Sequence, residues 1–266
     1  MWSSTPTGSS STIRGSVGGC DEPVMDPSAL VDEPARHLRL AGTRNMRDIG
    51  GYPAAGGRRT RWRTLLRTDA LDALPTASQA RLLDLGLRQV IDLRWPFELA
   101  ELPSVFASSG AVRYRSIPLL DNPPAPAEGL PHIYRRMLDE RGGELAAVVR
   151  ALLEDDALPA IIGCAGGIDR TGVTIALILT AIGVPPEVVA TDYALSAACF
   201  ATDGIDAGLD DWRAGTVEVN CLPEYMASTL EHLDLKHEGA ASLLHRHGVG
   251  PADLAELVER LTMPLD

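Results

Sequence analysis

The chain has 266 residues, of which 45% are hydrophobic and 23% are charged, a balance typical of globular proteins. Its formal net charge of −12 argues against a protein that binds nucleic acids in general. Its four cysteines are scattered and form no Cys-x-x-Cys pair, which excludes a disulfide scaffold and a zinc site of that type.

The N-terminal part differs in composition from the rest of the chain. Residues 1–34 are rich in Ser, Thr, Gly and Pro and predict a disordered leader, followed by a single domain over 35–266. The leader lacks the apolar segment of a signal peptide, and the longest apolar run, which starts at Val173, is too short to cross a bilayer. We therefore expect a cytoplasmic protein with no membrane partner, while secretion without a signal peptide stays open.

Positive charge is concentrated in the segment from Arg36 to Arg67. It contains nine arginines and one acid, Asp48, on an otherwise acidic chain. Such a local cluster suits a small anion better than a polyanion. For the arginines between Arg58 and Arg63, a solvated surface loop is an equally good interpretation.

Helical and strand-like segments alternate after this region. A helix is expected to start with a capping box at Thr76 and Gln79, and buried and half-buried strands follow over 88–94 and 113–120. A proline-rich loop leads to a helical stretch over 132–155, broken at Gly142 and Gly143. The next predicted elements are a strand over 157–163, an apolar helix over 171–182, and helices over 187–197, 223–236, 240–247 and 252–261. Residues 202–216 are predicted to form an acidic loop or lid.

This alternation predicts an α/β fold, with a central, mostly parallel sheet flanked by helices and a helical C-terminal portion. Ligands of such folds bind beyond the carboxyl ends of the strands. Asp92 and Arg94 end one predicted strand, and Cys164 follows another. We therefore expect these residues to share one crevice.

The stretch "IIGCAGGIDRTG", Ile161 to Gly172, is the most informative motif. Cys164 lies on a bend before a helix, where free backbone amides and the helix dipole favour anions. Gly166 and Gly167 allow successive amides to turn inward, and the guanidinium of Arg170 can grip two oxygens of a tetrahedral anion. The same field favours the thiolate form of the cysteine. The loop therefore predicts a nucleophile directed at phosphorus.

Two other interpretations of the loop are weaker. A Walker phosphate loop needs a lysine after its glycines, and the only lysine of the chain is Lys236. A small buried cysteine would explain Cys164 alone but not the glycines, the acid and the arginine beside it.

The motif "CAGGIDRTG" resembles the signature loop of the cysteine-dependent protein tyrosine phosphatases. It is most similar to the bacterial tyrosine/dual-specificity branch, whose loop typically reads Cys-x-x-Gly-Lys-Asp-Arg-Thr-Gly. Further stretches resemble the family in the expected order over roughly residues 38–262: "NMRDIGGY" (45–52), "LLRTDAL" (65–71), "VIDLRWPFE" (90–98) and "DYALS" (192–196).

The resemblance implies a cysteine phosphatase fold and a role for each residue of the loop. Cys164 would attack phosphorus and carry a phosphocysteine intermediate, and Thr171 would donate a hydrogen bond to its sulfur. The phosphoryl group would be bound by Ala165, Gly166, Gly167, Ile168, Asp169 and Arg170.

Two carboxylates compete for the role of general acid. The resemblance favours Asp169, which lies in the loop itself, over Asp92. The alternative for Asp92 is a strand-end carboxylate paired with an arginine such as Arg94 or Arg47.

The chain departs from the family pattern at two positions. Gly163 replaces the usual histidine, which is expected to help prepare the thiolate. Ile168 replaces a lysine that would contact extra phosphates of an inositol ring. We therefore expect a phosphorylated protein or a small aryl phosphate as substrate, rather than a phosphoinositide.

The implied function is that of a protein tyrosine phosphatase, with dual specificity left open. A phosphate-binding pseudophosphatase, a phosphoinositide phosphatase, and a sulfurtransferase or arsenate reductase stay as alternatives. We expect neither cofactor nor metal, and the histidine pairs at 232/237 and 245/247 are expected to face solvent because their spacing does not suit a helical metal site.

Overall fold

The computed structural model describes residue 33 and residues 35–121, 129–201 and 221–265. The predicted lid over 202–216 and, apart from residue 33, the predicted leader lie outside these residues.

A five-stranded sheet forms the centre of the structure, in the order β1-β4-β7-β5-β6. All neighbouring strands in it are parallel except β1, which is antiparallel to β4. The strands are β1 (Arg47–Asp48), β4 (Leu65–Thr68), β7 (Ala160–Gly163), β5 (Gln89–Asp92) and β6 (Arg113–Ser116). The prediction of an α/β fold with a mostly parallel sheet is confirmed.

Alternating side chains divide the core into two layers. Leu65 and Ile162 belong to the larger apolar cluster on one face of the sheet, whereas their neighbours Leu66 and Ile161 belong to the smaller cluster on the other face. Successive side chains of a strand point to opposite faces, so each strand supplies both layers.

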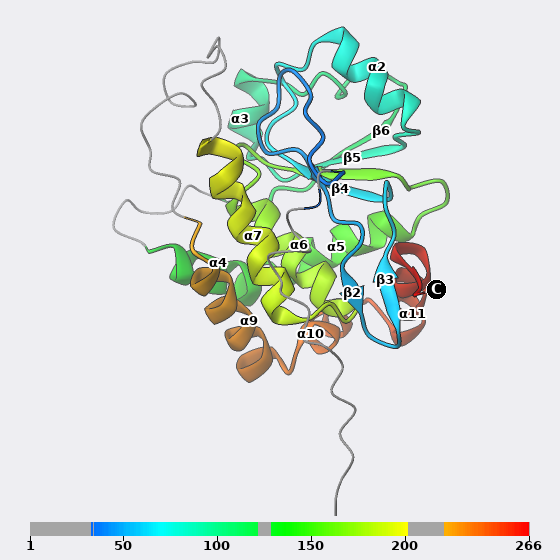
Figure 1. The fold of residues 1–266 in the computed structure, drawn as a ribbon. Helices are drawn as coiled ribbons and strands as arrows, with labels where there is room; N and C mark the ends of the chain where they lie inside the picture. The colour runs from blue at the N-terminus through cyan, green and yellow to red at the C-terminus, as the bar shows by residue number, and fades with distance from the viewer. Residues whose placement is uncertain (1–32, 34, 122–128, 202–220, 266) are drawn as a thin grey trace, which may run out of the picture.

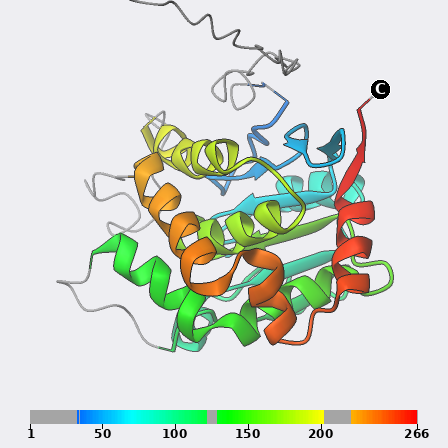
Figure 2. The same ribbon diagram turned by 90° about the horizontal axis from the view of Figure 1, so that it is seen from below.

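Helices cover both faces of the sheet (Figure 1). Helix α2 (Thr76–Asp84) lies over the smaller cluster, where Leu82 is fully buried. Short α3 (Pro96–Glu101) follows β5. The larger face is covered by α4 (Leu130–Glu140), α5 (Gly142–Leu153), α6 (Asp169–Ala181), α7 (Pro186–Ala201), α9 (Pro223–His237), α10 (Ala240–Arg246) and α11 (Pro251–Leu261), as the view in Figure 2 shows.

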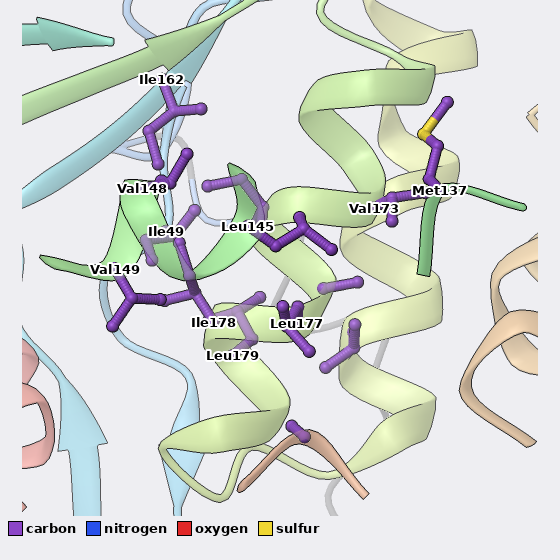
Figure 3. Packing of buried hydrophobic residues seen from close by; sticks show 14 of the residues in the cluster. Ile49, Met137, Leu145, Val148, Val149, Ile162, Val173, Leu177, Ile178 and Leu179 are labelled. Carbon is purple, nitrogen blue, oxygen red and sulfur yellow. The ribbon is translucent and has the colours of Figure 1, made fainter. Parts of the chain in front are cut away.

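Helix α6 is the centre of the larger layer. Its residues from Arg170 to Leu179 are all buried, as expected for a helix that is apolar on every side. Figure 3 shows Leu177 and Ile178 packed among Leu145 and Val149 of α5. The start of α6 is therefore fixed by the core.

A small antiparallel sheet, which the sequence did not predict, joins residues 53–60 to residues 262–264. It pairs β2 (Pro53–Ala54) with β3 (Arg58–Thr60), and β3 with β8 (Thr262–Pro264). The guanidinium of Arg58 donates to Thr262 Oγ1 at 2.6 Å. Part of the arginine-rich segment is therefore used to hold the C-terminus.

Two local predictions need correction. Thr76 is the first residue of α2 and its side chain makes no capping hydrogen bond, because Pro75 takes the N-cap position and Gln79 donates to the carbonyl of Leu74 instead. The predicted break at Gly142 lies one residue earlier, at Arg141, between α4 and α5. In the part of the chain that the structure describes, every helix is too short or too polar to cross a membrane.

Candidate active site

The cysteine loop connects the central strand β7 to the buried helix α6. Cys164 follows the last residue of β7 directly and is 2% exposed, and Arg170 lies in the first turn of α6. Thr68 of β4 and Asp92 of β5 are both paired in register with Gly163. The ends of β4, β5 and β7 therefore lie side by side at one edge of the sheet.

Two glycines of this region allow the loop to approach β4. Gly167 has φ +65°, and a Cβ there would lie 2.4 Å from the carbonyl oxygen of Thr68. A Cβ at Gly163 would lie 2.9 Å from Thr68 Cγ2. The glycine that replaces the family's histidine thus stands where β4 leaves no room for a side chain unless Thr68 moves.

The carbonyls of the loop are tied to one side by Asn45, which precedes β1, and by Arg67 of β4. Asn45 Nδ2 donates to Gly166 O at 3.0 Å and to Gly167 O at 3.1 Å, and Arg67 Nη2 donates to Gly167 O at 2.8 Å. The C=O and N–H of a trans peptide point in opposite directions. Holding these carbonyls therefore turns the amides of Gly167 and Ile168 to the opposite side.

A buried network of ion pairs and hydrogen bonds holds Arg67 in its contact with the loop. Asp192 of α7 accepts from Arg47 Nε at 3.2 Å, from Arg67 Nη1 at 2.6 Å and from the Tyr52 hydroxyl at 2.9 Å. Burial alone would raise the pKa of Asp192, but the two guanidinium groups hold it below its usual range. Asp192 thereby fixes Arg67 against the loop.

The signature arginine has a carboxylate partner to which the sequence analysis gave no role. Glu98 of α3 accepts from Arg170 Nη1 at 2.6 Å and from Nη2 at 3.0 Å, and the guanidinium stacks 3.9 Å from the ring of Trp95. Burial opposes the charge of Arg170, but the hydrogen bonds to Glu98 and the charge of Cys164 raise its pKa. A guanidinium has five N–H donors, so donors remain for an oxyanion.

Asp169 is half-buried and hydrogen-bonded to a tyrosine. The hydroxyl of Tyr134 on α4 donates to Asp169 Oδ1 at 2.5 Å, and a hydrogen bond of 2.7 Å joins the hydroxyls of Tyr134 and Tyr193. Burial raises the pKa of Asp169, although Tyr134 and Arg170 act in the opposite direction. The net direction is a pKa above the ordinary value of an aspartate.

Asp92, the competing carboxylate, is enclosed in an ion pair. It is 5% exposed, accepts from Arg94 Nη2 at 2.8 Å and Nε at 3.0 Å, and accepts from the Tyr114 hydroxyl at 3.0 Å. Of the two arginines considered as its partner, Arg94 is the one that bonds it, while Arg47 pairs with Asp192.

The other predicted residues lie in or beside the loop. Ala165, Gly166 and Ile168 are half-buried, and Ile168 packs against the larger apolar cluster. The hydroxyl of Thr171 is buried, and it has no hydrogen-bond partner within the described ranges.

The clustered arginines have different partners. Arg47 and Arg67 support it, whereas Arg58 pairs with Glu259 and Arg63 with Asp48. The signals for the supporting residues were present in "NMRDIGGY", "LLRTDAL" and "DYALS", but their pairing needed the fold.

The prediction that the histidines face solvent is wrong for His237, which is 8% exposed. His232 Nε2 and His237 Nε2 lie 2.9 and 2.7 Å from Asp139 Oδ1. These three groups are close enough to be considered for a metal ion. However, Arg246 donates to His237 Nδ1, which places the imidazole proton on Nε2, and Lys236 occupies the other carboxylate oxygen. The cluster is satisfied by hydrogen bonds and does not fit a cation.

Comparison with known proteins adds a family to this geometry. The family model described as "Tyrosine phosphatase family" matches residues 38–263. A Cupriavidus necator protein named as a tyrosine-protein phosphatase is 28% identical over 182 residues, which are 63% of this chain and 65% of that protein. The match therefore spans slightly less than two thirds of that relative. A tyrosine-protein phosphatase of Nostoc commune is 26% identical over 215 residues, covering 74% of this chain and 73% of the relative.

Two solved structures of the P. aeruginosa protein TpbA are also similar. One has a TM-score of 0.34 and 20% identity, covering 52% of this chain and 72% of the other. The second, a variant in complex with phosphotyrosine, has a TM-score of 0.35 and 18% identity, covering 61% and 79%. Both scores are low, so these similarities do not bear on the activity of this chain.

Proposed function

The chain belongs to the tyrosine phosphatase family, and we propose that it hydrolyses phosphotyrosine esters through a phosphocysteine intermediate. The observation that carries this proposal is the loop between β7 and α6. There Cys164 and Arg170 stand on either side of a backbone whose carbonyls are tied away by Asn45 and Arg67. A nucleophile, a cation and inward-turned amides together match a transferring phosphoryl group.

In the first step, the sulfur of Cys164 forms a bond to phosphorus while the bond from phosphorus to the tyrosine oxygen breaks. The electron pair of that bond goes to the phenolic oxygen, which takes the proton of Asp169. In the second step, water attacks phosphorus and gives a proton to Asp169, and the electron pair of the S–P bond returns to sulfur. The unpartnered hydroxyl of Thr171 would stabilise the departing thiolate.

Charge on the phosphoryl oxygens is met by Arg170 and by the amides of residues 165–169. Glu98 orients the guanidinium without using all its donors, and Trp95 covers one of its faces. Fixed donors of this kind need no reorganisation during the reaction, which is the main source of such stabilisation.

Asp169 is the better candidate for the general acid. Its burial favours the protonated form, and it is joined to the loop by sequence. Asp92 is bonded on both oxygens by Arg94, so its protonation would break a buried ion pair. We assign it a structural role at the end of β5.

We base the proposed substrate class on Ile168, a half-buried apolar residue of the loop. An aromatic phosphoester gains from apolar contact, whereas an inositol ring with several phosphates would need a cation there. Turnover of a phosphotyrosine peptide should therefore exceed that of phosphatidylinositol phosphates, and a phosphoserine peptide tests dual specificity in the same assay.

The first experiment compares wild type with Cys164→Ser on para-nitrophenyl phosphate. We expect turnover in the wild type and a loss of at least about 10⁴-fold in the variant. Binding of phosphotyrosine peptide by the wild type without turnover would indicate a pseudophosphatase instead. Turnover that survives in Cys164→Ser would refute the phosphocysteine intermediate.

A further inference from the structure

Two tyrosines stand behind the carboxyl group of Asp169, outside the loop that binds phosphate. Helix α6 contacts both α4 and α7, and each of these helices supplies one tyrosine. Tyr134 is fully buried and Tyr193 is 1% exposed, and their rings pack edge to face with centroids 5.8 Å apart. A buried phenol needs a hydrogen-bond partner, and here the two phenols and the acid serve one another.

The direction of these hydrogen bonds follows from the number of protons. A phenol has one proton, and Tyr134 gives its proton to Asp169 Oδ1. The 2.7 Å contact between the phenols then requires Tyr193 to donate to Tyr134. Burial raises the pKa of Tyr193, and the neighbouring thiol of Cys221, just before α9, acts in the same direction.

The ring of Tyr193 is itself held in place by the signature helix. A Cβ added to Gly172 would lie 2.9 Å from Tyr193 Cδ2, so the ring rests on a helical turn that has no side chain. This glycine is part of the motif that contains Cys164. The same motif therefore provides both the phosphate loop and the space for the tyrosine pair.

We propose that Tyr134, backed by Tyr193, is a positioning residue that holds Oδ1 of Asp169 and thereby leaves Oδ2 to carry the proton for the leaving group. This proposal rests on the proposed function, in which Asp169 is the general acid. Only one oxygen of a protonated carboxyl bears the proton, and its orientation decides whether the proton faces the substrate.

Tyr134 also sets the pH at which the acid works. The groups that face Asp169 are Tyr134 on α4, Tyr193 on α7, Cys221 before α9 and Arg170 on its own helix. A donated hydrogen bond stabilises the ionised carboxylate, so its removal raises the pKa of Asp169 further. The alkaline limb of kcat/KM, where the acid loses its proton, should then move to higher pH.

The test compares Tyr134→Phe with a matched variant, Tyr114→Phe. Both lose only a hydroxyl that donates to an aspartate, at 2.5 Å to Asp169 and at 3.0 Å to Asp92. For Tyr134→Phe we expect the alkaline limb to rise by about one pH unit. We also expect kcat for phenyl phosphate, whose phenolate is a poor leaving group, to fall about tenfold. The kcat for para-nitrophenyl phosphate should change much less. Tyr114→Phe should leave the limb and the leaving-group dependence as in wild type.

The background of Asp169→Asn separates this proposal from the proposed function. If Asp169 is the acid, the pH profile of kcat/KM for Asp169→Asn has no alkaline limb. Adding Tyr134→Phe to this variant then causes no further change in the profile. A normal leaving-group dependence in Asp169→Asn would refute the assignment of the acid. A wild-type limb in Tyr134→Phe, together with a defective Asp169→Asn, would refute the positioning role alone.

A measurement without turnover keeps the proposal testable in a slow enzyme. The carboxyl carbon of Asp169 can be titrated by NMR in wild type, in Tyr134→Phe and in Tyr193→Phe. An upward pKa shift that is largest in Tyr134→Phe supports the proposal, and equal pKa values in all three proteins overturn it. Tyr193→Phe keeps the Tyr134 hydroxyl that donates to Asp169. This variant therefore also tests the proposal if Tyr134→Phe does not fold.

Discussion

The ends of strands β5 and β7 carry the same residue types in different arrangements. Strand β5 ends in Asp92, with Arg94 two residues on, and the loop after β7 leads to Asp169 and Arg170 at the start of α6. Each aspartate accepts a hydrogen bond from a tyrosine. After β5, the arginine turns back on its own aspartate. After β7, the arginine is engaged by Glu98 from another element.

Under the proposed function, this difference separates a structural carboxylate from the general acid. A bidentate partner within two residues neutralises Asp92 and closes the pair on itself. Asp169 accepts a hydrogen bond from a tyrosine hydroxyl instead of a guanidinium. Burial then shifts its pKa upward, toward the protonated form. We therefore infer that the two strand ends differ in role because their arginines have different partners.

The strongest test of this comparison is the exchange of each aspartate for asparagine. Asp169→Asn should lower kcat for phenyl phosphate by roughly 100- to 1,000-fold, because the leaving oxygen loses its proton donor. Para-nitrophenyl phosphate, whose leaving group needs little protonation, should lose far less. The two kcat values, measured from pH 5 to 9, check this expectation. A leaving-group-dependent loss in Asp92→Asn instead would reverse our assignment of the two strand ends.

Asp92→Asn should act on stability. The substitution removes the close partner of the buried Arg94 and leaves it only the ion pair with Asp72 at 3.9 Å. Breaking a buried pair in this way costs about 3 kcal/mol of unfolding free energy. Urea denaturation measures the loss, with Asp84→Asn on the exposed end of α2 as a control. If Asp92→Asn were as stable as the control, the ion pair after β5 would have no structural role.

Glu98→Gln tests whether the function of Arg170 depends on its ion pair with the carboxylate of Glu98. The variant keeps the shape of the side chain but weakens the grip on Arg170, so kcat/KM should fall by about tenfold. Inhibition by vanadate should weaken in parallel, because the oriented guanidinium binds it. The exposed neighbour in α3 provides the control, Glu101→Gln, for which we expect wild-type kinetics.

The smallest effect is expected for the stability contribution of Asp139, a carboxylate that belongs to neither strand end. Burial works against the charge of Asp139, but hydrogen bonds from Lys236, His232 and His237 lower its pKa from 3.8 to about 2. Since the folded-state pKa is depressed, its contribution to stability is present above pH 4 and is lost as the pH falls toward 2. Asp139→Asn should therefore lower Tm slightly at pH 6 and have no effect near pH 2, as followed by circular dichroism. If the Tm difference between Asp139→Asn and wild type were the same at pH 6 and near pH 2, ionisation of Asp139 would be excluded as its cause.

The sequence predicted the elements whose patterns are local. Helices α5, α6, α7, α9, α10 and α11 and strands β5, β6 and β7 occur where periodicity placed them, and the loop after β7 was identified from its own residue types. The short strands β1, β2, β3 and β8 were not predicted, because two to three residues carry no detectable period and their pairing joins distant segments.

The missed parts of the site are those that depend on contacts between distant segments. Glu98 was part of a quoted motif, yet its contact with Arg170 spans 72 positions and has no sequence signature. Tyr134 lay in a predicted helix with no motif around it, and only the packing of α4 against α6 brings it to Asp169. The solvent-facing interpretation of His237 failed for the same reason, since α4 covers it with Asp139.

The ion network of Arg47, Arg67 and Asp192 has a consequence for the medium in which the protein works. Its side chains are 0–1% exposed, so mobile ions have no access to them. Screening weakens contacts between solvated charges over about 10 Å at 0.1 M salt, but it acts much less on charges enclosed in the interior. The shape of the phosphate cradle should therefore be indifferent to ionic strength, and any salt dependence of the reaction should arise from the encounter with the substrate.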